Sequence, residues 1–254
     1  MVDGMPDAMP EGTTEPQRFG PIPRASTSGE SSDVLSRRVQ MLATEHWGLL
    51  AARSTAQSEV LTRITIFLTL VSASLLTIGV LGQATRFDGP FPTAALSILG
   101  FLSAVGTMTT TRVMNVSEED LMYVVAMNRL RAAYVELDPA LERYFMSAFT
   151  DDMAAMAQTY SFLRRRGPSV GAGSSAVLII VVNACVLGLF VGGGTYAFGA
   201  SLTIAVTVGL LTAMSAASIA AVLGYHTFRT AWRRYRPLRP TREAPPYLRG
   251  DPGE

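Results

Sequence analysis

The sequence predicts an all-α integral membrane protein with four transmembrane helices and a cytoplasmic helical bundle. Only 16% of the 254 residues are charged, whereas charged residues make up about a quarter of a typical soluble domain. Charges are also missing from three long runs, residues 64–85, 89–111 and 167–228. Buried helices of a large soluble protein do not explain the longest run, because no charge would remain to solvate an exposed face.

The length of these runs predicts where the chain crosses the membrane. A helix needs about 20 apolar residues to cross roughly 30 Å of hydrocarbon. The first two runs each fit one span, and the third fits two, with GGGTYAFGAS at 192–201 as the break. We therefore expect spans at residues 64–84, 91–112, 174–194 and 202–225.

The placement of arginine predicts the orientation. All 21 basic residues are Arg, which indicates a GC-rich bacterial genome. The span 1–2 connection contains only Arg86 and the span 3–4 connection contains none, whereas the span 2–3 connection and the C-terminal tail contain seven each. Basic residues near span ends stay in the cytoplasm. We therefore expect a plasma-membrane protein with both termini and the span 2–3 loop in the cytoplasm.

Two cytoplasmic segments precede span 1. Residues 1–32 are rich in Pro, Gly, Ser and Thr, which predicts a disordered tail. Residues 33–63 show a heptad pattern, which predicts a helix continuous with span 1. The seam of that helix consists of Leu35, Val39, Leu42, His46, Leu49, Arg53, Ala56 and Val60. His46 and Arg53 are its polar members. Arg53 needs a carboxylate opposite it, and the candidates are Glu136, Glu118 and a carboxylate of another subunit. Trp47 points off the seam, and we expect it to rest on the central helices.

Residues 113–166 form the other part of the predicted bundle. A helix is expected to begin at Ser117, before three acidic residues, and to end at Asp138-Pro139. It has apolar groups on two opposite sides, which predicts packing between neighbours. Its candidate interaction residues are Asn128, Arg129, Arg131, Tyr134 and Glu136. A third helix follows, with Thr150 as its expected cap and Arg164–Arg166 in its last turn. Residues 226–254 are read as a basic, Pro-rich cytoplasmic tail.

Small residues at four-residue spacing predict close helix packing inside the membrane. The candidates on span 3 are Gly188 and Gly192, and those on span 4 are Gly209, Ala213 and Ala217. Asn183 stands out among the polar residues within the spans. We interpret its side chain as joining two helices by a hydrogen bond.

Catalytic, metal and cofactor sites are not predicted. The two histidines, His46 and His226, are far apart in sequence, and the single cysteine, Cys185, lies within span 3. The glycine-containing segments lack a P-loop lysine. We therefore expect no enzyme activity and no cofactor. The basic clusters lie beside span ends, which favours contact with the lipid bilayer over nucleic acid.

Three segments show a resemblance to a known group. EHWGLLAARS (45–54), TRITIFLTLVSASL (62–75) and MNRLRAAYVELDPALERYF (127–145) resemble an uncharacterised family of actinobacterial multi-span membrane proteins. The resemblance implies the four-helix topology and no particular activity. A weaker similarity is to two-span, helix-extended membrane modules of bacterial defence systems, which are thought to form pores. This chain departs from those modules by its four spans and its long central loop.

Two functions are consistent with these patterns. The first is a non-enzymatic membrane protein whose cytoplasmic bundle mediates self-association or binds a cytoplasmic protein partner. The second is an oligomeric channel or effector pore, suggested by the polar stripe of span 1, which includes Thr65, Thr69 and Ser72.

Overall fold

The structure is a computed structural model that describes residues 32–160 and 174–241, and every regular element within them is a helix. The elements are α1 (Ser32–Thr85), α2 (Phe91–Leu137), the 3₁₀-helix η1 (Pro139–Tyr144), α3 (Met153–Tyr160), α5 (Ser175–Ala197) and α6 (Leu202–Arg234). The predicted all-α class is thus confirmed for these residues. Four helices, α1, α2, α5 and α6, are long and apolar enough to cross a membrane. Of the predicted tail at 1–32, residues 1–31 lie outside the described residues, and Ser32 begins α1. Arg164–Arg166 and residues 242–254 also lie outside the described residues.

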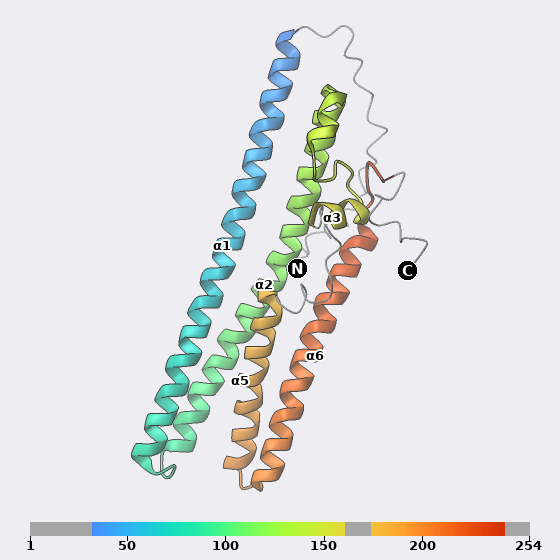
Figure 1. The fold of residues 1–254 in the computed structure, drawn as a ribbon. Coiled ribbons are helices and arrows are strands. Elements are labelled where there is room, and N and C mark those ends of the chain that lie inside the picture. The colour runs from blue at the N-terminus through green and yellow to red at the C-terminus, as the bar shows by residue number, and fades with distance from the viewer. Residues whose placement is uncertain (1–31, 161–173, 242–254) are drawn as a thin grey trace, which may run out of the picture.

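The four long helices stand in a row in the order α1, α2, α5, α6 (Figure 1). α2 packs against α1 on one side and α5 on the other, and α5 packs against α6. The apolar part of α6 is the least buried of the four. A row of this kind leaves broad apolar faces on both sides and encloses no channel within one chain.

α1 and α2 are much longer than a membrane span. α1 has 54 residues, so it is about 80 Å long at 1.5 Å per residue. α2 has 47 residues and runs through Ser117, so the expected helix start at Ser117 is wrong. The Ser117 hydroxyl donates to the Val113 carbonyl 2.8 Å away instead of capping a new helix. The reason is that residues 107–137 contain neither Gly nor Pro, so nothing stops the helix that begins in the apolar segment.

Asp138 ends α2, as the Asp138-Pro139 pair predicts. Its backbone is extended, as expected for a residue before proline. Its carboxylate accepts a hydrogen bond of 2.9 Å from the Ala140 N–H, which starts η1. The chain therefore turns sharply at the end of α2 and folds back along it.

Two hydrophobic clusters hold the helices together. The first joins α1, α2 and α5 through Val60, Ile64, Phe67, Val113, Val116 and Ile179. The second joins α2 and α3 through Val124, Met127 and Met156, with Leu49 of α1 and Trp232 of α6 packed against it. In the second cluster, which lies outside the apolar runs, full burial of one side chain stabilises the fold by about 1.5–3 kcal/mol. We call the polar end of the molecule around the second cluster, residues 32–63, 113–160 and 226–241, the head.

Neighbouring elements cover the two apolar sides expected for residues 117–137 unequally. Val124 and Asn128 on the first side are buried against α3 and its preceding loop. Met122 on the second side is 64% exposed. An open groove runs along that side of α2, between Leu49 of α1 and Trp232 of α6. Among the described residues, α3 thus covers part of the first side, and the second side lines a groove between α1 and α6.

Candidate functional site

Asp120 is the hub that ties α1, α2 and α3 together. Arg53 donates two hydrogen bonds to its carboxylate, from Nε at 2.6 Å and from Nη2 at 3.1 Å. Gln57 donates a third at 2.9 Å, and the Tyr160 hydroxyl donates a fourth. Burial raises the pKa of Asp120, but the bonds from Arg53 and Tyr160 outweigh it and hold that pKa below its ordinary range. The seam arginine thus finds its carboxylate within its own chain, and that carboxylate is neither Glu136 nor Glu118.

A second ion-pair group lies closer to the apolar segments. Arg112 of α2 pairs with Glu59 of α1 at 3.1 Å and with Glu119 at 2.9 Å. Arg63 pairs with Glu59 at 2.9 Å. These side chains are exposed to solvent, which screens their charges, so each pair contributes little to stability. They mark the boundary between the head and the apolar helices.

Asn128 anchors the loop before α3. Its side chain is fully buried, and its Nδ2 donates to the Thr150 carbonyl at 3.1 Å. Its Oδ1 accepts hydrogen bonds from Arg131 at 2.6 Å and from the Thr159 hydroxyl at 3.1 Å. A buried amide left without these partners would cost about 1–3 kcal/mol. Asn128 therefore fixes how the loop and α3 sit on α2.

Asp151 holds the chain that follows α6. Its buried carboxylate accepts hydrogen bonds from Arg129 Nε at 2.8 Å and the Tyr235 hydroxyl at 2.7 Å. It also accepts the backbone N–H groups of Leu238 at 3.0 Å and Arg239 at 2.8 Å. Burial raises the pKa of Asp151, but these donors together hold it below its ordinary range. We call this arrangement the Asp151 clasp.

The clasp continues at Asp152. Its carboxylate accepts the Thr241 N–H at 2.7 Å and the Thr241 hydroxyl at 2.9 Å. The same carboxylate caps α3 by accepting the Ala155 N–H at 2.9 Å, so the expectation that Thr150 is the cap is wrong. Arg239 adds an ion pair to Glu136. Residues 235–241 therefore lie as an ordered strap across the start of α3.

The sequence carries no signal for this strap. Two acidic residues precede α3, and only Asp152 caps the helix. The donors that bind Asp151 include two backbone N–H groups. Every residue except proline has such a group, so no residue type marks the partner in the sequence.

Four of the residues singled out in the sequence, His46, Trp47, Arg131 and Tyr134, line one open pocket of about 400 Å³ in the head. The pocket lies between α1, the last turns of α2 and the segment that contains η1. Its lining residues are Ala43, His46, Trp47, Arg131, Tyr134, Leu141 and Phe145. The His46 and Tyr134 rings lie 6.4 Å apart between centroids. Trp47 does not rest on the central helices as expected, since it is 69% exposed. We call this cavity the head pocket.

The charges of the head pocket are not balanced. Arg131 donates to Asn128 but forms no ion pair with a carboxylate of the described residues. Burial and the neighbouring Arg53 lower its pKa. His46 Nδ1 is buried and finds no hydrogen-bond partner within residues 32–160 and 174–241. Burial and Arg131 lower the pKa of His46, which keeps the imidazole neutral at pH 7. Within the part of the chain that the structure describes, the pocket therefore holds a guanidinium without a carboxylate partner beside the imidazole of His46.

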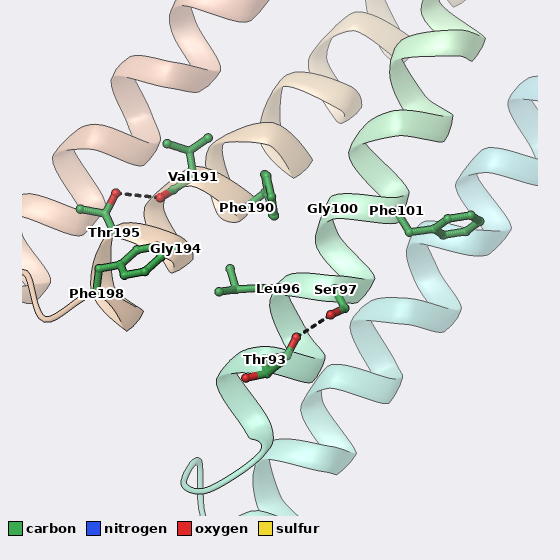
Figure 2. A pocket seen from close by; sticks show the side chains of 10 residues that line it. All are labelled: Thr93, Leu96, Ser97, Gly100, Phe101, Phe190, Val191, Gly194, Thr195 and Phe198. Atoms are coloured by element: carbon green, nitrogen blue, oxygen red, sulfur yellow. Dashed lines mark hydrogen bonds between the residues drawn. The ribbon is translucent and has the colours of Figure 1, made fainter.

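A larger groove, of about 710 Å³, lies between α2 and α5 at the end opposite the head (Figure 2). Its walls are mainly apolar and include Leu96, Phe101 and Phe190. The Ser97 and Thr195 hydroxyls already donate to carbonyls of their own helices, both at 2.8 Å. This groove offers apolar walls and no charged group, so it provides no site for chemistry.

The predicted small residues meet where α5 and α6 are closest. A Cβ added at Gly188 would lie 2.7 Å from the Gly209 carbonyl oxygen and 3.0 Å from the Ala213 Cβ. A Cβ at Gly192 would lie 2.9 Å from the Ala205 carbonyl oxygen. The two backbones thus touch directly at these positions. Ala217 lies two turns beyond Gly209 and is partly exposed.

Asn183 joins α5 to α2. Its Nδ2 donates to the Thr107 hydroxyl at 3.4 Å. Its Oδ1 faces Gly106, where an added Cβ would lie only 2.1 Å away. Only glycine at 106 leaves room for the amide, and the bond links two of the apolar helices.

The described residues contain no group of three or more His, Cys, Asp or Glu side chains arranged to hold a metal ion. The chain matches no protein-family model, no curated protein and no solved structure. The class of this protein therefore rests on its own structure, an all-helical chain with four apolar helices of membrane-spanning length. The resemblance to the actinobacterial family stays a prediction.

Proposed function

We propose that this chain is a multi-pass plasma-membrane protein without enzymatic activity, whose cytoplasmic head mediates self-association or binds a protein partner. Four helices of sufficient length and apolarity support the membrane assignment. The hub at Asp120 and the Asp151 clasp support the head as a rigid binding body, since they tie α1, α2, α3 and the strap together.

The distribution of arginine supports the orientation. The α1–α2 and α5–α6 turns lie at the end of the molecule opposite the head (Figure 1). Among the residues of these two turns, 86–90 and 198–201, Arg86 is the only basic one. The head contains many arginines, and basic residues remain on the cytoplasmic side. The head and both ends of the chain are therefore assigned to the cytoplasm.

The extension of α1 past the end of α2 is the observation that favours self-association. The His46–Tyr134 contact is near the end of α2, so residues 32–42 extend about 15 Å further (Figure 1). This extension continues the heptad seam with Leu35, Val39 and Leu42, and Val39 is 44% exposed. From His46 onward the same seam packs against α2. Seam positions of a coiled coil are covered by a partner helix, and a second copy offers the same pattern.

The test is the mass of the full-length protein in nanodiscs, measured by mass photometry. We expect a discrete oligomer, and we expect Val39→Glu to reduce its mass to that of the monomer. Thr44→Glu adds the same charge on the opposite, exposed face of α1 and serves as the matched control. A monomeric wild-type protein, or equal behaviour of the two variants, would reject self-association through this seam.

The oligomeric channel is a second candidate. Thr65, Thr69 and Ser72 form a stripe on an exposed face of α1. Their hydroxyls donate to carbonyls of their own helix, at 2.8–2.9 Å. Such a stripe would line a pore only if several copies turned it toward a common axis. Ion flux into liposomes that Thr69→Leu abolishes is the result expected of a channel, and tight liposomes would exclude it.

A further inference from the structure

Arg131 differs from the other partly buried arginines of the head. Arg53 pairs with Asp120, Arg129 with Asp151, Arg239 with Glu136, and Arg112 with two glutamates. Arg131 is also partly buried, yet within the described residues it bonds only to a neutral amide oxygen. A buried charge without a counter-ion is costly, and an anion that reaches it gains the full charge-assisted hydrogen bond.

His46 adds a second polar side chain to the lining of the same cavity. Its Nδ1 is buried and has no hydrogen-bond partner among the described residues. A buried polar atom without a partner costs about 1–3 kcal/mol. The imidazole and the Arg131 guanidinium line the same pocket, so a ligand that binds Arg131 lies beside the His46 ring.

Aromatic side chains form the rest of the wall. Trp47, Tyr134 and Phe145 line the cavity, and Leu141 adds an aliphatic surface. The volume of about 400 Å³ is within the range of about 300–1,000 Å³ that is usual for small-molecule sites. Flat rings stack well on such walls.

The position of the pocket excludes a lipid headgroup. His46 lies 18 residues before Ile64, where the apolar run of α1 begins. At 1.5 Å per residue, the pocket is about 27 Å from that boundary. The polar headgroup region of a bilayer extends only about 5–8 Å beyond the hydrocarbon. The ligand must therefore come from the aqueous phase.

We infer that the head pocket binds a small, planar organic anion from solution. Its carboxylate or phosphate group lies against Arg131 and His46, and its ring lies against Trp47 and Phe145. Residues 32–42 of α1 do not line this pocket, so the site is separate from the proposed self-association.

The test uses the full-length protein in nanodiscs and equilibrium dialysis with adenosine monophosphate and benzoate as probes. Adenosine and benzyl alcohol are the neutral counterparts, and inorganic phosphate is the anion without a ring. At least one of the two anionic probes should bind more tightly than both its neutral counterpart and inorganic phosphate. Arg131→Gln should weaken that binding about tenfold or more, as expected for loss of a charge-assisted hydrogen bond.

Arg37→Gln removes the same charge from an exposed position of α1 and should leave the affinity unchanged. Trp47→Ala is a second variant, because its exposed ring can be removed without disturbing the core, and it should also weaken binding. The inference is overturned if neither anionic probe binds, if neutral and anionic probes bind equally, or if Arg131→Gln has the same effect as Arg37→Gln.

Discussion

Asp151 shows how one side chain positions a segment more than 80 residues away in sequence. Four donors converge on its buried carboxylate, and two of them are backbone N–H groups of the strap. A carboxylate with this many donors is stabilised in its charged form even when buried. The strap therefore depends on the charge of Asp151.

We predict that Asp151→Asn releases the strap. The amide keeps one acceptor oxygen but loses the charge, which should reduce stability by about 2–3 kcal/mol. Hydrogen–deuterium exchange should show faster exchange at the amides of Leu238 and Arg239. Asp33→Asn removes the same charge from the exposed first turn of α1 and should change neither quantity. Unchanged protection of both strap amides in Asp151→Asn would contradict the assignment.

His46 makes the head sensitive to mild acid. Burial and Arg131 place the pKa of His46 below its ordinary value of 6.5, and Tyr134 is the other ring that faces it. As the pH falls below 6.5, the unfolded chain takes up the proton before the folded chain does, so stability decreases. The loss ends once the pH is below the folded pKa.

We therefore predict a lower melting temperature at about pH 5.5 than at about pH 7.5, with part of that slope due to His46. His46→Gln removes the titrating group and should reduce the slope. The only other histidine, His226, supplies the control variant His226→Gln, which should keep the wild-type slope. Equal slopes for wild type and His46→Gln would rule out this role.

At the scale of elements, the α5–α6 contact depends on glycine residues, which have no side chain. Gly188 and Gly209 let the two backbones approach so closely that an added Cβ meets a carbonyl oxygen at less than 3 Å. Backbone cannot move aside as a flexible side chain does. Close approach maximises van der Waals contact, which is the main attraction between helices where no water is expelled.

We predict that Gly188→Ala separates α5 from α6 and costs about 1–3 kcal/mol. Gly79→Ala is the matched control, because a Cβ there meets nothing within 4 Å. Alanine is also the better helix former, so Gly79→Ala should be neutral or slightly stabilising. Thermal unfolding in the same detergent compares the two. A Gly188→Ala variant as stable as Gly79→Ala would mean that the helices do not pack this closely.

At the scale of the whole molecule, the row of helices explains why one chain has so much exposed apolar surface. α2 and α5 occupy the middle of the row, while α1 and α6 each pack along one side only (Figure 1). Lipid or further copies of the chain would cover the outer faces in a bilayer. The head adds a long arm, the extension of α1 past the end of α2, beyond this row.

We predict that the head and the interhelical turns lie on opposite sides of the membrane. In a Cys185→Ser background, Phe198→Cys places a thiol in the α5–α6 turn and Glu142→Cys places one in the head, both at exposed positions. A membrane-impermeant maleimide should label intact cells at position 198 only. Labelling at position 142 instead would mean that the orientation is inverted.

The sequence by itself determined the four apolar helices and the end of α2. Uncharged runs and the Asp138-Pro139 pair act through local length, composition and backbone restriction, so they can be recognised without a structure. It also pointed to His46, Trp47, Arg131 and Tyr134, although not to the pocket that joins them.

Only the tertiary structure decided which polar groups meet. Arg53 had several possible acidic partners in the sequence. It pairs with Asp120 because the antiparallel packing of α1 and α2 places these two residues opposite each other. The Asp151 clasp depends on backbone donors from a distant segment, which no residue type reveals. Among the described residues Arg131 bonds only to Asn128, while Asp120 and Asp151 are bound to Arg53 and Arg129.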